Sequence, residues 1–177
     1  MAGVSFVVCK RTSLEQSADI RPRSYYLNLL AQHQYFEKSQ QFRFTPPVQV
    51  LYALEQALIE YFEETGEGRY TRYSKSYDTL IAGLRHLGFR LLLRSEQHSK
   101  LLTAVIEPTH ANYSYDAMHD YLIERGFTIY PGKGAKKKTF RLANIGQINQ
   151  HDIAAFIEAL SQYLAHAELV GQLYGEM

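Results

Sequence analysis

The chain has 177 residues, of which 46% are hydrophobic, so it can bury the core of one domain or of one domain and a smaller second one. Its 19 basic and 18 acidic residues give a formal net charge of +1, which indicates no overall field toward nucleic acid or a membrane surface. The single cysteine excludes an internal disulfide framework and favours a reducing compartment, so we expect a cytoplasmic protein. The seven histidines show no zinc-ligand spacing, so we expect no structural metal. No apolar run approaches the ~20 residues of a membrane span, so we expect no such span.

The first third of the chain contains three short segments. Gly3–Cys9 is rich in valine and predicts a buried strand, which needs neighbouring strands on both sides. Ser13 opens a Ser-x-x-Gln capping box that predicts a short helix to about Ile20, stopped by Pro22. The segment Tyr25–Phe36 fits helical and strand periods equally well, so its structure stays open.

A helix is predicted to start within RFTPPVQV. Thr45 suits its N-cap and two prolines suit its first positions. Helix N-termini bind phosphate through free amides, and because prolines lack amide hydrogens, the Thr45 hydroxyl gains importance there. The alternative role of Thr45 is that of an N-cap alone. Apolar residues continue on one face of this helix, and EETGEG at Glu63–Gly68 interrupts it.

The next helical segment carries an apolar stripe from Tyr73 to Leu87 and ends at Gly88. Arg69, Arg72 and Lys75 alternate with tyrosines, a pattern that also occurs where proteins bind single-stranded nucleic acid. The simpler interpretation is that the tyrosines form the packed face and the basic residues the solvent face, so we expect no nucleic-acid partner.

The last half of the chain predicts a compact α/β sandwich with one sheet covered on one side by helices. The predicted strands are residues 89–93, 101–106, 127–130 and 139–145. Helices are predicted at residues 115–124 and from about Gln150, with a frayed tail from His166 onward.

Arg141 is the first candidate for a functional residue. Strand alternation sends its side chain to the face opposite Phe140 and Leu142. A guanidinium in that position can bind a carboxylate or a phosphonate through two parallel hydrogen bonds. The alternative is a strand arginine that extends into solvent. In the preceding loop, Lys133 and Lys136–Lys138 predict a solvated basic segment.

Three motifs, taken in order, resemble a known family. IYPGK at 129–133, FRLANIG at 140–146 and RFTPP at 43–47 are together similar to class V pyridoxal-phosphate (PLP) aminotransferases, and within them to the 2-aminoethylphosphonate:pyruvate aminotransferases. The resemblance runs over nearly all of this chain but covers only the second half of the family's chain.

This resemblance implies the C-terminal part of a fold type I aminotransferase. Residues 1–75 would be the end of the large PLP-binding domain with the start of a long connecting helix, and residues 76–177 the small α/β domain. In the family, the lysine that forms the Schiff base precedes a strand like Gly3–Cys9, so we expect that lysine to be missing here. Lys10 follows the strand and does not take its role.

The resemblance also implies specific partners. Thr45 would contact the PLP phosphate of the neighbouring subunit in a homodimer, Arg141 would bind the substrate's carboxylate or phosphonate, and Lys133 would add positive potential. The complete enzyme would move an amino group from 2-aminoethylphosphonate, or a similar small amine, to pyruvate, a 2-oxo acid. The alternative is a catalytically inactive, truncated remnant that acts as a dimerisation or anion-binding module.

Overall fold

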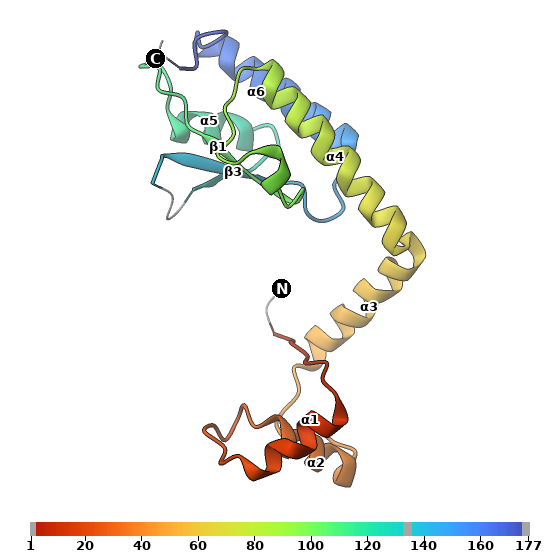
Figure 1. Ribbon diagram of the computed structural model, residues 1–177. Coiled ribbons are helices and arrows are strands. Elements are labelled where there is room, and N and C mark those ends of the chain that lie inside the picture. The colour runs from red at the N-terminus through yellow and green to blue at the C-terminus, as the bar shows by residue number, and fades with distance from the viewer. Residues whose placement is uncertain (1–2, 133–135, 175–177) are drawn as a thin grey trace. The chain divides into compact units, whose positions relative to one another are not determined.

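The computed structural model describes residues 3–132 and 136–174 (Figure 1). The chain forms two compact units, an N-terminal unit of residues 1–63 and a C-terminal unit of residues 64–177. The boundary between the units falls after residue 63, whereas the predicted domain boundary follows residue 75, because the helix that spans residue 75 packs against other elements of the C-terminal unit. Whether residues 1–75 belong to the large domain of a longer protein stays a prediction.

The N-terminal unit contains short helices joined by loops. They are α1 (Arg11–Gln16), the 3-10 turn η1 (Ser17–Asp19), α2 (Leu29–Ser39) and most of α3 (Val48–Glu64). The predicted capping box at Ser13 is wrong, because α1 already begins at Arg11. The ambiguous segment after Pro22 becomes a loop followed by α2, whose first turn is capped by Asn28 accepting from the Ala31 amide at 3.0 Å.

The prediction of a buried strand at Gly3–Cys9 is wrong. This segment forms no strand, and its apolar side chains are exposed, with Phe6 at 80% and Val8 at 89%. A strand requires a hydrogen-bonded neighbour, and none of the described residues supplies one. No described residue of the whole N-terminal unit is buried.

The junction between α3 and α4 (Gly66–His86) lies within Glu63–Gly68, where the sequence predicted that the helix is interrupted. Thr65 stands between the helices with a φ of 68°, and its hydroxyl accepts a hydrogen bond from the Gly68 amide at 3.0 Å. The start of α3 differs from the prediction. The Leu51 amide donates to the Pro47 carbonyl at 3.0 Å and the helix begins at Val48, so Thr45 precedes the cap position and does not cap it.

The C-terminal unit is built on a three-stranded antiparallel sheet in the order β1-β3-β2. Its strands are β1 (Leu102–Ile106), β2 (Tyr130–Pro131) and β3 (Thr139–Ala143). The predicted strand at residues 89–93 is reduced to one bridge, between Leu91 and Val105. It is followed by the 3-10 turn η2 (Ser95–Gln97).

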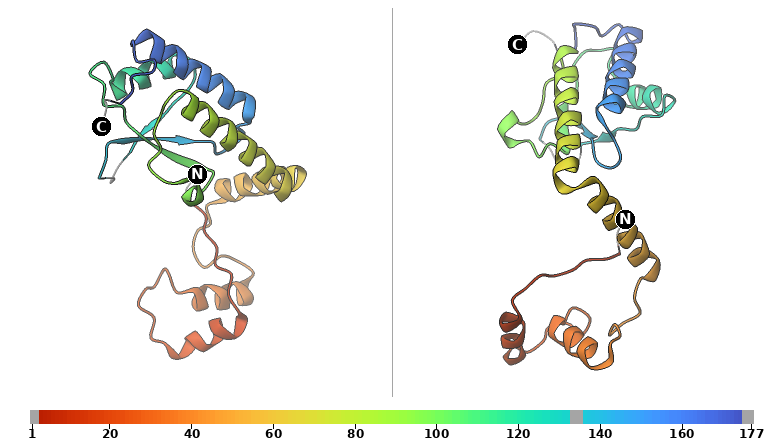
Figure 2. Two further views of the ribbon diagram at one scale, coloured as in Figure 1. Left: turned by 45° about the horizontal axis from the view of Figure 1, so that its top comes forward. Right: turned by 90° about the vertical axis from the view of Figure 1, so that its right-hand side faces the viewer.

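Three helices cover one face of this sheet, as the sequence predicted. They are α4, α5 (Tyr115–Ile123) and α6 (Gln150–His166), and Figure 2 shows α4 and α6 side by side. The core lies between the helices and the sheet and includes the following buried residues: Leu80, Leu84, Val105, Met118, Leu122, Phe140, Leu142, Phe156 and Leu160. The segment after His166 is not frayed as predicted, because Leu169 and Leu173 are buried in this core.

Candidate anion-binding site at Arg141

The central strand β3 positions Arg141. Its neighbours Phe140 and Leu142 are buried against the helices, so alternation places Arg141 on the other face of the sheet. In the register of the sheet, Arg141 lies opposite Ala104 of β1 and Tyr130 of β2. The small Ala104 and the exposed Tyr130 therefore flank the guanidinium on the face away from the helices.

The hydrogen bonding of Arg141 is incomplete. Its side chain is half-buried, and its Nε atom is buried without a hydrogen-bond partner in the described part of the chain. A buried guanidinium donor without an acceptor costs free energy, and a bound carboxylate or phosphonate would remove that cost. A carboxylate or phosphonate oxygen that reaches Nε would satisfy this donor, although Nε is covered by the protein in this conformation.

Tyr115 at the start of α5 belongs to the surroundings of Arg141. Burial raises the pKa of the Tyr115 hydroxyl, Asp116 and Glu107 raise it further, and the positive charge of Arg141 acts in the opposite direction. The hydroxyl donates to the Ile129 carbonyl at 3.1 Å. Tyr115 thus stays neutral near pH 7, and it does not neutralise the charge of Arg141.

Hydrogen bonds to α4 and to the loop before β1 fix the residues that follow β3. Asn144 is fully buried, and its Nδ2 donates to the Tyr73 carbonyl at 3.2 Å and to the Lys100 carbonyl at 3.1 Å. Arg72 of α4 donates through Nη1 to the carbonyls of Gly146 at 2.6 Å and Ile148 at 2.9 Å. These contacts hold the strand that carries Arg141 in a defined register against α4.

Sequence reasoning missed the role of Arg72. Its side chain is only 18% exposed and pairs with Glu64, so it does not lie on the predicted solvent face. The sequence did not indicate the pair of Glu64 and Arg72, because a glycine-rich break separates them and they are not at the usual helical i,i+4 spacing.

The other predicted site residues lie apart from this arrangement. Thr45 is exposed and belongs to the N-terminal unit, whereas Arg141 belongs to the C-terminal unit, so the structure does not bring the two together within one unit. Lys133 lies outside the described residues. Lys10 is the exposed N-cap residue of α1, and that it is not catalytic stays a prediction.

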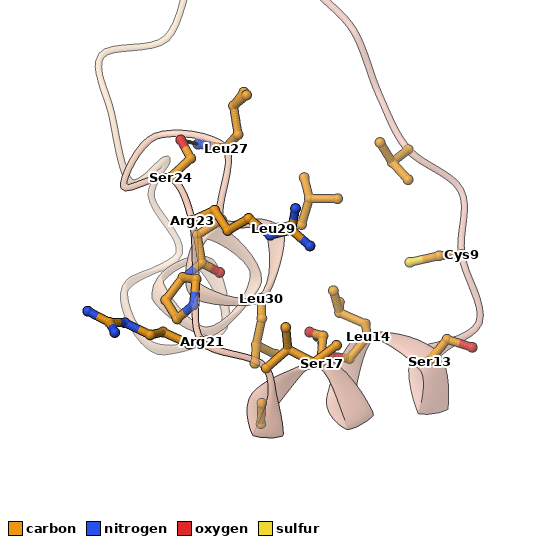
Figure 3. A pocket seen from close by; sticks show the side chains of 15 residues that line it. Cys9, Ser13, Leu14, Ser17, Arg21, Arg23, Ser24, Leu27, Leu29 and Leu30 are labelled. Atoms are coloured by element: carbon orange, nitrogen blue, oxygen red, sulfur yellow. Dashed lines mark hydrogen bonds between the residues drawn. The ribbon is translucent and has the colours of Figure 1, made fainter.

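The N-terminal unit contains an open, mainly apolar groove of about 570 Å³. Figure 3 shows Leu14, Leu29 and Leu30 lining it, with Arg21 and Arg23 nearby. Because no described residue of this unit is buried, the groove is exposed apolar surface and not an enclosed cavity.

The described residues contain no group of three or more His, Cys, Asp or Glu side chains arranged to hold a metal ion. Within the same residues, no helix is both long enough and apolar enough to pass through a membrane.

Similarity to solved structures defines the class of fold. An alanine–glyoxylate aminotransferase from Nostoc sp. matches 88% of this chain and 42% of its own, with a TM-score of 0.75 and 23% identity. A pyridoxamine–pyruvate aminotransferase from Mesorhizobium loti matches 90% of this chain and 42% of its own, with a TM-score of 0.75 and 21% identity. The chain has the fold of part of a fold type I aminotransferase, which confirms the predicted fold class.

Sequence similarity is more specific. The chain is 40% identical over 162 residues to the 2-aminoethylphosphonate–pyruvate transaminase of Vibrio parahaemolyticus, and 37% identical over 164 residues to that of Rhizobium meliloti. These matches confirm the resemblance predicted from the three motifs. The chain spans less than half the length of these relatives, 44% and 43% respectively. No family model matches the chain.

Proposed function

We propose that this chain supplies the substrate-anion-binding part of a PLP-dependent transaminase that moves an amino group from 2-aminoethylphosphonate, or a similar small amine, to pyruvate. The similarity to 2-aminoethylphosphonate–pyruvate transaminases over about 90% of the chain supports this proposal. The observation that carries it is the half-buried Arg141, whose Nε has no partner among the described residues.

Arg141 binds and orients the substrate in this proposal. Pyruvate carries a carboxylate and 2-aminoethylphosphonate a phosphonate, and both present two oxygens to the fork of a guanidinium. One site can then hold the amino donor and the amino acceptor in turn. Lys133 adds positive charge for the same anions.

PLP, when bound, supplies an electron sink for the carbon that exchanges its amino group. Thr45 would hold the PLP phosphate of the partner subunit, and its exposed hydroxyl is free to donate to a phosphate oxygen. An exposed threonine hydroxyl is compatible with that role. We assign no lysine of this chain to the covalent bond with PLP, and we expect the chain alone to show no transaminase turnover.

We also propose that the complete protein is a cytoplasmic homodimer. The exposed apolar side chains of the N-terminal unit support association with a partner surface. The exposed free thiol of Cys9 is suited to a reducing compartment.

The activity can be tested in a chimera. Residues of the Vibrio parahaemolyticus relative that the match does not cover would be joined to this chain, and alanine formation from 2-aminoethylphosphonate and pyruvate would be measured with added PLP. We expect turnover in the chimera, and a rise in KM of at least about tenfold for both substrates in Arg141→Gln, equivalent to ~1.4 kcal/mol of lost binding.

Arg125→Gln provides the matched control, because it removes an arginine at the end of α5 whose guanidinium donates to the Tyr121 carbonyl. It should leave KM unchanged. A well-folded chimera without alanine formation would contradict the proposed reaction and favour an inactive binding module. Turnover that is indifferent to Arg141→Gln would remove Arg141 from the site.

A transaminase also needs a covalent anchor for PLP. If the chain alone is mixed with PLP and treated with borohydride, we expect mass spectrometry to find no lysine modified at stoichiometric yield. Specific labelling of one lysine, such as Lys10, would contradict our assignment.

A further inference from the structure

A second cavity in the C-terminal unit has a different character from the groove described above. It has a volume of about 500 Å³ and lies beside the end of β1, the residues before β3 and the segment that follows α6. Arg90, Lys137 and Lys138 line it together with Glu107 and Tyr174. Neither Arg141 nor Thr45 lines this cavity.

Hydrogen bonds hold the walls of the cavity in place. The Tyr174 hydroxyl donates to the Ile106 carbonyl at 2.6 Å and accepts from the Arg90 amide at 3.1 Å. The Glu107 amide donates to the Lys138 carbonyl at 3.1 Å, which joins the residues after β1 to the residues before β3. These bonds hold the backbone of the walls in place, whereas the exposed side chains of Lys137 and Lys138 would become ordered on binding.

The charge of the cavity is unbalanced. None of Arg90, Lys137 and Lys138 forms an ion pair within the described chain, and neither does Glu107. Three cations and one carboxylate leave a net charge of +2 at neutral pH. The guanidinium carbon of Arg90 lies 4.5 Å from the centre of the Tyr174 ring. This cation–π contact holds the Arg90 guanidinium beside Tyr174 at the edge of the cavity.

We propose that this cavity binds the doubly charged phosphoryl group of a small molecule. Two lysines and an arginine can each donate charge-assisted hydrogen bonds to phosphate oxygens, and a dianion matches the net charge of +2. The exposed part of the Tyr174 ring would pack against the nonpolar part of the ligand. Glu107 weakens the binding of the dianion by like-charge repulsion. This inference does not depend on the transaminase proposal.

The test uses the complete chain and inorganic phosphate at constant ionic strength, with binding followed by isothermal titration calorimetry. We expect saturable binding with one site at the cavity, in addition to any phosphate bound at Arg141. The double variant Lys137→Gln/Lys138→Gln and the single variant Arg90→Gln should each weaken binding at least about tenfold. Glu107→Gln should tighten binding, which a variant that merely misfolds would not do.

Two controls separate this cavity from other basic surfaces. Lys136→Gln removes the same charge from the same loop, but the exposed Lys136 does not line the cavity, so binding should be unchanged. Arg141→Gln removes any phosphate bound at the proposed substrate site, so the binding that persists in this variant is the binding at the cavity, which Arg141 does not line. An absence of saturable binding, an equal loss in Lys136→Gln, or a loss confined to Arg141→Gln would overturn the proposal.

Discussion

The carboxylate of Glu64 receives two hydrogen bonds from Arg72, from Nε at 2.5 Å and from Nη2 at 3.0 Å. Arg69 donates a third, from Nε at 2.7 Å. Since Arg72 also donates to the carbonyls of Gly146 and Ile148, one arginine connects the last residue of α3 with the loop that follows β3. This network stabilises the register of the strand that carries Arg141.

The first prediction concerns stability and pH. Hydrogen bonds from Arg72 and then Arg69 lower the pKa of Glu64 from 4.5 to about 2. Because the folded pKa lies below the unfolded one, the stabilisation is complete above pH 4.5 and is lost as the pH falls toward 2. In urea titrations, Glu64→Gln should therefore cost stability at pH 7 and much less at pH 2.5.

Glu63→Gln is the control for this pH series, because it removes an exposed neighbouring carboxylate that accepts no hydrogen bond from an arginine within the described residues. It should change the free energy of unfolding little at either pH. A Glu64→Gln cost that is the same at pH 7 and pH 2.5 would show that the ion pair does not stabilise the fold.

The second prediction concerns the contact between α4 and α6. A Cβ added at Gly83 would lie 2.6 Å from Cγ1 of Ile157. Gly→Ala inside a helix normally stabilises by ~1 kcal/mol, but here the clash dominates, so we expect Gly83→Ala to destabilise by ~1–3 kcal/mol. Thermal unfolding followed by circular dichroism measures this. Ile157→Ala should partly reverse the loss, and two fully additive losses would argue against direct contact.

The third prediction compares the hydroxyls of the half-buried Tyr113 and the buried Tyr163. The Tyr113 hydroxyl is buried without a hydrogen-bond partner among the described residues, and burial raises its pKa. The Tyr163 hydroxyl donates to the Ser114 carbonyl at 3.2 Å. We expect Tyr113→Phe to stabilise the protein by up to ~1 kcal/mol and Tyr163→Phe to destabilise it by ~1 kcal/mol. Equal losses in chemical denaturation would indicate that Tyr113 has an acceptor.

The fourth prediction concerns the N-terminal unit. Its apolar side chains are exposed, so we expect the purified chain to run larger than a monomer in analytical ultracentrifugation. The double variant Phe6→Ser/Val8→Ser should shift the distribution toward monomer. Val170→Ser removes an apolar side chain that is 66% exposed in the C-terminal unit and should not change the distribution. A wild-type chain that remains monomeric at all concentrations would refute the expectation.

The sequence alone was sufficient for several features that depend on near neighbours, although the predicted caps at Ser13 and Thr45 were wrong. The apolar stripe of α4, its end shortly before Gly88 and the end of α5 before Gly126 could all be predicted, because both glycines adopt the positive φ that stops a helix. The face of β3 that carries Arg141 followed from alternation between Phe140 and Leu142.

Tertiary structure decided what depends on distant partners. Gly3–Cys9 has strand composition but no described strand to pair with, and residues 89–93 pair through a single bridge. Arg72 turns inward because Glu64 and the Gly146 and Ile148 carbonyls are brought to it by the fold. Helical caps and alternation are set within a few residues, whereas strand pairing and buried ion pairs require segments far apart in the chain to meet, and spacing along the sequence does not contain that information.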